Sequence, residues 1–296
     1  LYSPLQFLTE VFYWWSDCMN SAQRVFEIID TAPEIAEKEN AVSLKNINGE
    51  VEFKNVSFAY GAEADKKCLD NINISIKSGE TVGILGATGS AKSTLVQLIP
   101  RLYDTTEGEV SVGGINVKKY DLEVLRDNVA MVLQKNVLFS GTIAENLRWG
   151  NKDATDEELV HACKLSQADE FIKTFPEGYN TYIEQGGTNV SGGQKQRICI
   201  ARALLKKPAI LILDDSTSAV DTKTDALIRK AFKEEIPNTT KIIIAQRVSS
   251  VQEADRIIVM DDGKINDIGT HDELLSRCEI YREVYESQVK GGSDDE

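Results

Sequence analysis

A glycine-rich turn between an apolar strand and an apolar helix constrains the fold of this chain more than any other feature. The strand is TVGIL, the turn GATGSAKST runs from Gly86 to Thr94, and LVQLI follows with helical spacing. Backbone N–H groups in such a turn, and at the start of the helix after it, point at one spot and hold phosphate oxygens there. The order of strand, loop and helix therefore predicts a nucleotide phosphate site in an α/β domain.

The loop residues have separate expected roles. Lys92 would reach the β- and γ-phosphates of ATP, and Ser93 would ligate Mg²⁺. The nucleotide-binding residues expected here are Gly86, Thr88, Gly89, Ser90, Ala91, Lys92, Ser93 and Thr94. Taken alone, the loop sequence fits an ordinary glycine-containing strand-to-helix turn almost as well as a phosphate-binding loop.

Ala91 departs from the phosphate-loop pattern, which has glycine immediately before the lysine. If the backbone there needs a positive φ, the Cβ costs about 1–2 kcal/mol. The methyl group also crowds a loop that must approach a phosphate closely. We therefore expect the loop to bind phosphate less well than one with glycine.

Two kinds of apolar pattern predict the rest of the fold. VEFKNVSFAY and LDNINISI alternate, which favours an antiparallel β subdomain with one buried face, whereas AILILDD and TKIIIAQ are continuous runs typical of buried strands. RIIVMDDGKI contains an Asp-Gly hairpin signal. Residues 142–206 read as an inserted α-helical subdomain, with a capping box at Thr155 and Glu158. The expected class is α/β, with a mostly parallel sheet covered on both faces.

The two ends of the chain carry different patterns. Residues 1–32 read as helix, Pro33 ends that pattern, and an acidic linker follows. The apolar stretch from Pro4 to Trp15 is too short to cross a bilayer, which takes about 20 residues. Residues 291–296 are expected to be a disordered tail.

Composition excludes several classes of function. The formal net charge is −14, and without a basic patch we expect no nucleic-acid partner. The cysteines are odd in number and have no ligand-like spacing, which argues against a disulfide framework or a zinc site. They are Cys18, Cys68, Cys163, Cys199 and Cys278.

Two further motifs decide the family. VSGGQKQR, from Val190 to Arg197, opens the helix ICIARALL, and the strand ILILD ends at Asp214, ahead of DSTSAVD. With the phosphate loop, in this order and spacing, the sequence resembles the ATP-binding cassette (ABC) ATPases from about residue 50 to 288. The resemblance implies a P-loop NTPase core that uses ATP and Mg²⁺.

The resemblance also implies roles for single residues. Tyr60 matches the aromatic residue on which adenine stacks, with an ordinary strand aromatic as the alternative. Gln134, in VLQKNVLFSGTIAENL, matches the glutamine that contacts Mg²⁺ and signals to the membrane part, and Asp214 matches the acid that holds the Mg²⁺ shell through water. Two cassettes of this family pair head to tail, so the signature serves the partner's ATP. The signature residues are Ser191, Gly192, Gly193 and Gln194.

The first residues are similar to the end of a membrane domain. SAQRVFEIIDTAPEI resembles the helix that leaves the last membrane span in exporter half-transporters. This implies that residues 1–45 are that helix end with a linker, and that residues 46–290 are the nucleotide-binding domain. The rest of the membrane domain would belong to the same polypeptide, with the cassette on the cytosolic face of the cell membrane.

Three departures fall on one ATP site. Asp215 stands where exporters of this family usually have the glutamate that acts as general base, and it is one methylene shorter. Gln246 stands where a histidine usually contacts the γ-phosphate, and its amide cannot carry charge. Ala91 is the third. Before the signature, Glu184 and Gln185 also replace the usual Gly and Glu.

An intact signature on a chain with a damaged site predicts an asymmetric exporter. The expected partner is a second half-transporter, a different chain with the catalytic Glu and the switch His intact. A homodimeric exporter of low turnover is the alternative, and a soluble cassette for DNA repair or translation is the least favoured. The transported substrate is not predicted, because the membrane domain that selects it is missing from the sequence.

Overall fold

The computed structural model describes residues 2–36, 40–44, 47–61 and 66–291. These residues divide into two compact units, residues 1–36 and residues 37–296.

The first unit contains one long helix, α1 (Tyr2–Ile29), which ends before Pro33. No residue of α1 is buried, and its large apolar side chains, including Trp14 and Trp15, are exposed. In the described part of the chain, no helix combines the length and the apolarity that crossing a membrane requires. Residues 37–39 of the predicted acidic linker lie outside the described residues.

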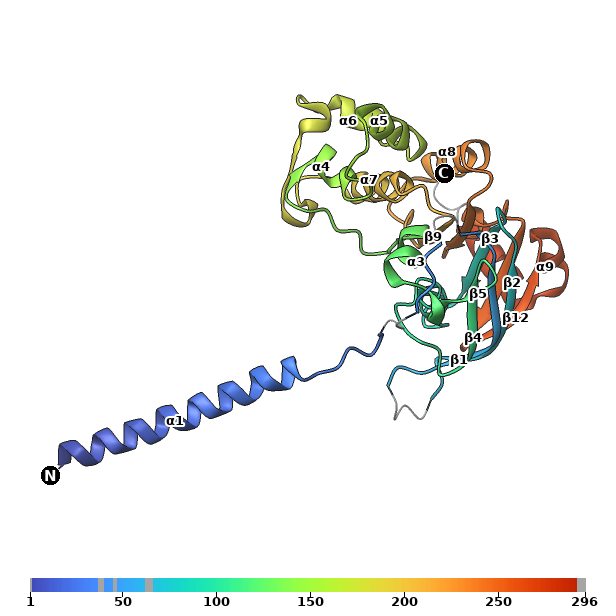
Figure 1. Cartoon of the computed structure of the whole chain (residues 1–296). Helices are drawn as coiled ribbons and strands as arrows, with labels where there is room; N and C mark the ends of the chain where they lie inside the picture. The colour runs from blue at the N-terminus through green and yellow to red at the C-terminus, as the bar shows by residue number, and fades with distance from the viewer. Residues whose placement is uncertain (1, 37–39, 45–46, 62–65, 292–296) are drawn as a thin grey trace. The chain divides into compact units, whose positions relative to one another are not determined.

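The second unit is built on a mostly parallel sheet (Figure 1). Its strands, in spatial order, are β12 (Lys264–Gly269), β11 (Arg256–Asp261), β3 (Thr81–Gly86), β10 (Thr240–Ile244), β9 (Ile210–Asp214) and β6 (Val129–Val132). All neighbouring pairs are parallel except β11 with β12, which is the hairpin predicted from RIIVMDDGKI. Its turn passes through Asp262 and Gly263, both at positive φ.

Both faces of this sheet are buried, as the continuous apolar strands predict. In β9, Ile210 and Ile212 belong to one core cluster, and Leu211 and Leu213 belong to the other. Successive side chains of a strand point to opposite faces, so each strand supplies two cores. The sheet therefore has no solvent-facing side at its centre, and polar groups concentrate where its strands end.

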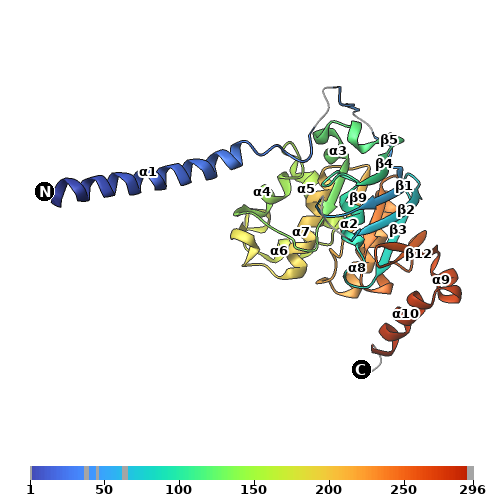
Figure 2. The same ribbon diagram turned by 90° about the horizontal axis from the view of Figure 1, so that it is seen from below.

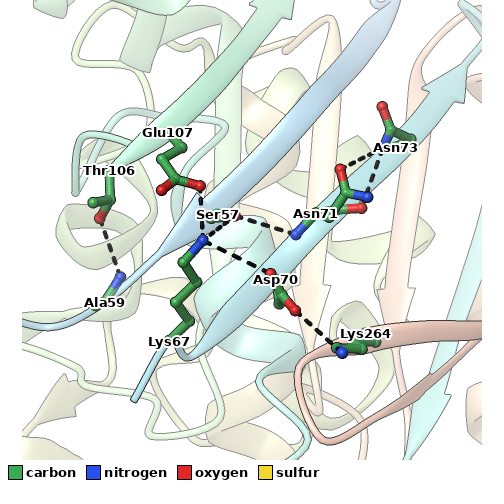
Figure 3. A network of polar contacts seen from close by, with 9 residues as sticks. All are labelled: Ser57, Ala59, Lys67, Asp70, Asn71, Asn73, Thr106, Glu107 and Lys264. Atoms are coloured by element: carbon green, nitrogen blue, oxygen red, sulfur yellow. Dashed lines mark hydrogen bonds and ion pairs between the residues drawn. The ribbon is translucent and has the colours of Figure 1, made fainter. Parts of the chain in front are cut away.

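The alternating segments form an antiparallel sheet of β2 (Leu69–Ile76), β1 (Val51–Phe58), β4 (Glu107–Val112) and β5 (Ile115–Asn116). A polar network beside the end of β1 joins these strands (Figure 3). Lys67 Nζ donates to Glu107 at 2.7 Å and to Ser57 Oγ at 3.4 Å. Thr106 Oγ1 accepts the Ala59 N–H at 3.2 Å, one residue before Tyr60.

The helical insertion contains α4 (Ile143–Arg148), α5 (Asp156–Leu165), α6 (Asp169–Thr174) and α7 (Gly192–Leu205). Both views show α4, α5 and α6 grouped near α7 (Figures 1 and 2), and α4 and α5 pack against α7. The predicted capping box at Thr155 and Glu158 is present, so α5 begins where the sequence indicates. A small sheet of β7 (Gly141–Thr142) and β8 (Tyr182–Ile183) accompanies these helices.

The remaining helices before β11 are α2 (Lys92–Gln97), η1 (Val117–Lys119), α3 (Leu122–Asn128), η2 (Gly178–Asn180), η3 (Gln185–Gly187), α8 (Thr222–Glu235) and η4 (Val248–Ser250). The C-terminal helices are α9 (His271–Arg277) and α10 (Glu279–Gly291), which follow β12 (Figure 2). The predicted tail after Gly291 lies outside the described residues. All five cysteines are described, and each is a free thiol.

Candidate functional site

The carboxyl ends of three parallel strands meet at one cavity. β3 ends at Gly86, β9 at Asp214 and β10 at Ile244, and these strands are neighbours in the sheet. The cavity has a volume of 380 Å³ and is lined by Cys68, Thr88, Gly89, Ala91, Lys92, Ser93, Thr94, Gln134, Asp214, Asp215, Ile244 and Gln246. Segments far apart in the sequence thus place their predicted site residues around one space, as expected for a parallel α/β sheet.

In the loop after β3, the backbone at Ala91 has the positive φ at which a Cβ is unfavourable. Ala91 has φ 68° and ψ 21°, in the left-handed region, and it is the residue immediately before α2. Gly89 also has a positive φ, 87°, with open space around its Cα. A Cβ on Gly86 would collide with the Met260 carbonyl and the Ser90 hydroxyl. The Cβ of Ala91 therefore lies at a position that favours glycine.

Lys92 bends back over the loop. Its ammonium donates to the Gly86 and Ala87 carbonyls, each at 2.8 Å, and to Ser90 Oγ at 3.3 Å. Burial lowers the pKa of Lys92, and the nearby carboxylates of Asp214 and Asp215 oppose that shift. The side chain thus places its positive charge against backbone carbonyl groups of the loop.

Asp214 faces the start of α2. Its Oδ1 accepts a hydrogen bond from Ser93 Oγ at 3.0 Å. Burial raises the pKa of Asp214, the charge of Asp215 raises it further, and the Ser93 bond and Lys92 oppose both effects. Two carboxyl groups with raised pKa beside one lysine form a site that a bound cation would stabilise.

Asp215 links two glutamines. Its Oδ2 accepts from Gln134 Nε2 at 3.0 Å and from Gln246 Nε2 at 2.8 Å. Burial raises the pKa of Asp215, although both amide bonds favour the carboxylate. Its φ of 48° turns the chain directly after β9. The three residues predicted for the base, the Mg²⁺ contact and the γ-phosphate contact therefore form one hydrogen-bonded group.

Tyr60 borders the phosphate loop rather than the lining of the cavity. Its hydroxyl bonds Thr94 Oγ1 at 2.9 Å, and its ring packs edge-to-face on Phe58 and Tyr103 with 49% of the residue exposed. Sequence reasoning missed Cys68, which lines the cavity 3.6 Å from Thr94 Oγ1. No motif marks Cys68, and only its place immediately before β2 could have suggested it.

The signature residues lie outside the cavity lining. Ser191 caps α7: its Oγ accepts the Gln194 N–H at 3.2 Å, and Gln194 Oε1 accepts the Ser191 N–H at 2.9 Å. Ser191 and Gly192 are exposed. A Cβ on Gly193 would lie 2.7 Å from the Ala219 carbonyl, so the loop after β9 packs closely against this helix start. Thr88, Gly89 and the rest of the phosphate loop are thus grouped separately from the signature.

Comparison with known families agrees with this geometry. The ABC transporter family model matches residues 69–218. The chain belongs to the ABC transporter family. This ABC chain is 44% identical over 289 residues to YgaD of Bacillus subtilis (strain 168), named as a multidrug export ATP-binding/permease protein, covering 97% of the chain and 50% of YgaD. It is 40% identical to an ATP-dependent lipid A-core flippase of Syntrophus aciditrophicus (strain SB), covering 98% of the chain and 48% of the flippase.

A solved structure supports the same fold. The ABC chain matches a bacterial Atm1-family ABC exporter with ATP bound, at a TM-score of 0.87 and 35% identity. The match covers 97% of this chain and 50% of the exporter chain. The α/β P-loop NTPase class, with its mostly parallel sheet, antiparallel β subdomain and inserted helices, is thereby confirmed. The chain spans about half the length of the relatives it matches.

Proposed function

We propose that this chain is the ATP-binding subunit of an export transporter, coupling ATP binding and hydrolysis to substrate efflux. The observation that carries the proposal is the convergence of the phosphate loop, Gln134, Asp214 and Gln246 on one cavity. Its volume of 380 Å³ lies in the range of small-molecule sites, about 300–1,000 Å³. The loop backbone and Lys92 would bind the phosphates, and Tyr60 would stack on adenine.

The residues fit Mg²⁺ as the accompanying ion. Among the described residues, no group of three or more His, Cys, Asp or Glu could hold a metal. Mg²⁺ keeps waters and binds through few protein oxygens plus substrate phosphates, so this donor set suits it. Ser93 and Gln134 would be its ligands and Asp214 would hold its water shell, and the bound ion would neutralise charge on the β- and γ-phosphates.

We infer that the chain's own site hydrolyses ATP poorly. Asp215 is shorter than the usual glutamate, and its Oδ2 already accepts from two amides. A water held about 1 Å from its best position can cost on the order of 100-fold in rate. Gln246 would offer the γ-phosphate a neutral donor in place of histidine.

The signature would act on the ATP of a second cassette. Ser191 and Gly192 are exposed and do not line this chain's own cavity, and the helix start can bind an anion from a facing subunit. An intact signature beside a damaged site favours a partner subunit of different sequence, with the catalytic Glu and the switch His intact.

The remaining part of the transporter would be a membrane domain in the same polypeptide. Residues 1–45 would be the end of its last helix and a linker, and residues 46–290 the cassette on the cytosolic face. The exposed apolar side chains of α1 and the length of the relatives support this. A separate groove of 350 Å³ suits contact with that domain. Its lining includes Phe139, Trp149 and the residues on both sides of Gln134 in the sequence.

Phosphate release by the purified chain tests the proposed function. We expect binding of Mg-ATP with turnover well below about 1 per second, the lower end of typical enzymes. Lys92→Ala serves as the control, because it removes the phosphate-binding cation and should weaken binding further. A chain that binds no nucleotide would contradict the proposed function. Turnover of about 1 per second or faster would contradict the inference that the site hydrolyses ATP poorly.

A further inference from the structure

The C-terminal helix α10 holds the loop that follows β10 through one side chain. Gln288 Oε1 accepts the Val248 N–H at 2.9 Å, and Gln288 Nε2 donates to the Gln246 carbonyl at 2.8 Å. Only one orientation of the amide satisfies both partners, because the reverse would set N–H against N–H and oxygen against oxygen. Gln288 therefore pairs with the backbone on both sides of Arg247.

The sequence of α10 explains how Gln288 reaches that loop. Tyr281, Val284, Tyr285 and Gln288 follow the spacing i, i+3, i+4, i+7 and share one face of the helix. Tyr281 is fully buried, with its hydroxyl 2.8 Å from His271 Nδ1. Val284 and Tyr285 pack against the core cluster that contains Val248. The apolar part of the face fixes the helix, and Gln288 is its polar end.

The loop is also anchored on either side of Gln246. Before it, the Ala245 N–H donates to the Ile84 carbonyl at 3.3 Å. After it, Ser250 Oγ donates to Asp225 Oδ2 at 3.0 Å. The backbone between these anchors is held by Gln288, while the Gln246 side chain points to Asp215.

We propose that Gln288 is a positioning residue, which sets the place of Gln246 relative to the γ-phosphate of bound ATP. This rests on the function proposed above, in which Gln246 contacts that phosphate. Gln288 touches no reacting atom; it acts through the backbone of Gln246. Its loss frees the loop to shift, so contacts to the γ-phosphate weaken while contacts to the other phosphates remain.

The comparison of Mg-ATP with Mg-ADP tests this inference, because only ATP carries the γ-phosphate. Calorimetric titration of the chain is carried out for wild type, Gln288→Ala, Gln246→Ala and the double variant. We expect Gln288→Ala to weaken binding of Mg-ATP about three- to tenfold, as for loss of the one hydrogen bond from Gln246 to the γ-phosphate. Binding of Mg-ADP should change less than about twofold. The double variant should bind Mg-ATP no more weakly than Gln246→Ala, because both act on one contact.

Two further variants separate positioning from stability. Glu283→Ala changes an exposed residue of the same helix and should leave both affinities unaltered. Gln288→Glu keeps the acceptor for Val248 but loses the donor to Gln246, and should reproduce the ATP-selective loss. It carries the test if Gln288→Ala does not fold.

The outcomes that overturn the inference are distinct. Equal weakening of both nucleotides, additive losses in the double variant, or unaltered Mg-ATP affinity would show that Gln288 only supports the fold. Equal affinity of the wild-type chain for Mg-ATP and Mg-ADP would show that Gln246 makes no binding contact with the γ-phosphate, which overturns the inference. A wild-type chain that binds neither nucleotide overturns the proposed function as well, and the wild-type titration alone reveals this.

Discussion

Two residues that line the cavity, Ala91 and Asp215, have a left-handed backbone conformation, with φ of 68° and 48°. Aspartate is enriched in this region, whereas alanine gains nothing there. At the scale of single residues, the two departures differ in kind. Ala91 affects the shape of the phosphate loop, and Asp215 affects the charge and reach of one carboxylate. Their consequences can therefore be measured separately.

Ala91→Gly should tighten nucleotide binding without restoring hydrolysis. It relieves a backbone strain of about 1–2 kcal/mol, which sets an upper limit of about 30-fold on the gain in affinity. Titration calorimetry with Mg-ATP measures the effect. Ala87→Gly is the matched control, since Ala87 is in the same loop but is not among the residues with positive φ. Unchanged affinity for Ala91→Gly would show that the loop tolerates the methyl group.

Asp215→Asn should stabilise the ligand-free chain at pH 7. Burial raises the pKa of Asp215, so the ionised form is less favourable in the folded state than in the unfolded state. The gain should appear as a higher Tm at neutral pH, and should vanish below about pH 4, where the carboxyl is protonated in both states. Thermal melts at both pH values test this, with exposed Asp153→Asn as control. A lower Tm at pH 7 would contradict the assignment.

At the scale of elements, hydrogen bonds join α7 to the loop after β9. The Gln196 side chain, 4% exposed, accepts the Ala219 N–H at 3.0 Å and donates to Ser218 Oγ at 3.3 Å. The signature at the start of α7 is thereby tied to the segment that begins with Asp215. If the signature acts on the ATP of a second cassette, as proposed, these hydrogen bonds would connect one cassette's own site to the site of its neighbour.

Gln196→Leu should lower the free energy of unfolding by about 1–3 kcal/mol, the cost of leaving a buried group unpaired. Urea denaturation measures this from the shift in midpoint at unchanged slope. Exposed Gln252→Leu, the same change of side chain, should be close to neutral. Equal effects of both variants would mean that Gln196 contributes no more than a surface residue.

Much of this arrangement could be predicted from sequence, because motifs record local geometry. The runs ILILD and TKIIIAQ predicted parallel buried strands, whose ends bring Asp214 and Gln246 to one edge. Contacts between distant segments without a motif could not be predicted. Gln288 lies 42 residues from Gln246, and only the packing of α10 brings them together. Cys68 likewise reaches the cavity through the pairing of β1 with β2.

At the scale of the whole molecule, the chain spans about half the length of its relatives. The proposed transport function therefore requires parts of the protein outside this sequence. The ATP site and the signature are separate surfaces of one cassette. In an asymmetric assembly, these two surfaces should tolerate damage to different degrees.

Damage to the signature should therefore stop transport, whereas damage to Asp215 should reduce it modestly. The double variant Ser191→Ala, Gly192→Asp is compared with the single variant Asp215→Asn. Both are made in the assembled full-length transporter and measured at saturating ATP. An Asp at position 192 would bring charge and bulk to where the partner's γ-phosphate would dock in the proposed assembly. ATPase rate and substrate flux are the measurements. Since Ser191 also caps α7, at about 1 kcal/mol, Ser191→Ala alone controls for stability. Equal losses would favour equivalent sites, as in a slow homodimer.

The bent-back side chain of Lys92 makes the loop a competitor for its own ligand. Three acceptors of the loop, Gly86 O, Ala87 O and Ser90 Oγ, take the three N–H donors of the ammonium. Any phosphoryl group that binds the Lys92 ammonium must therefore displace at least one of these loop acceptors.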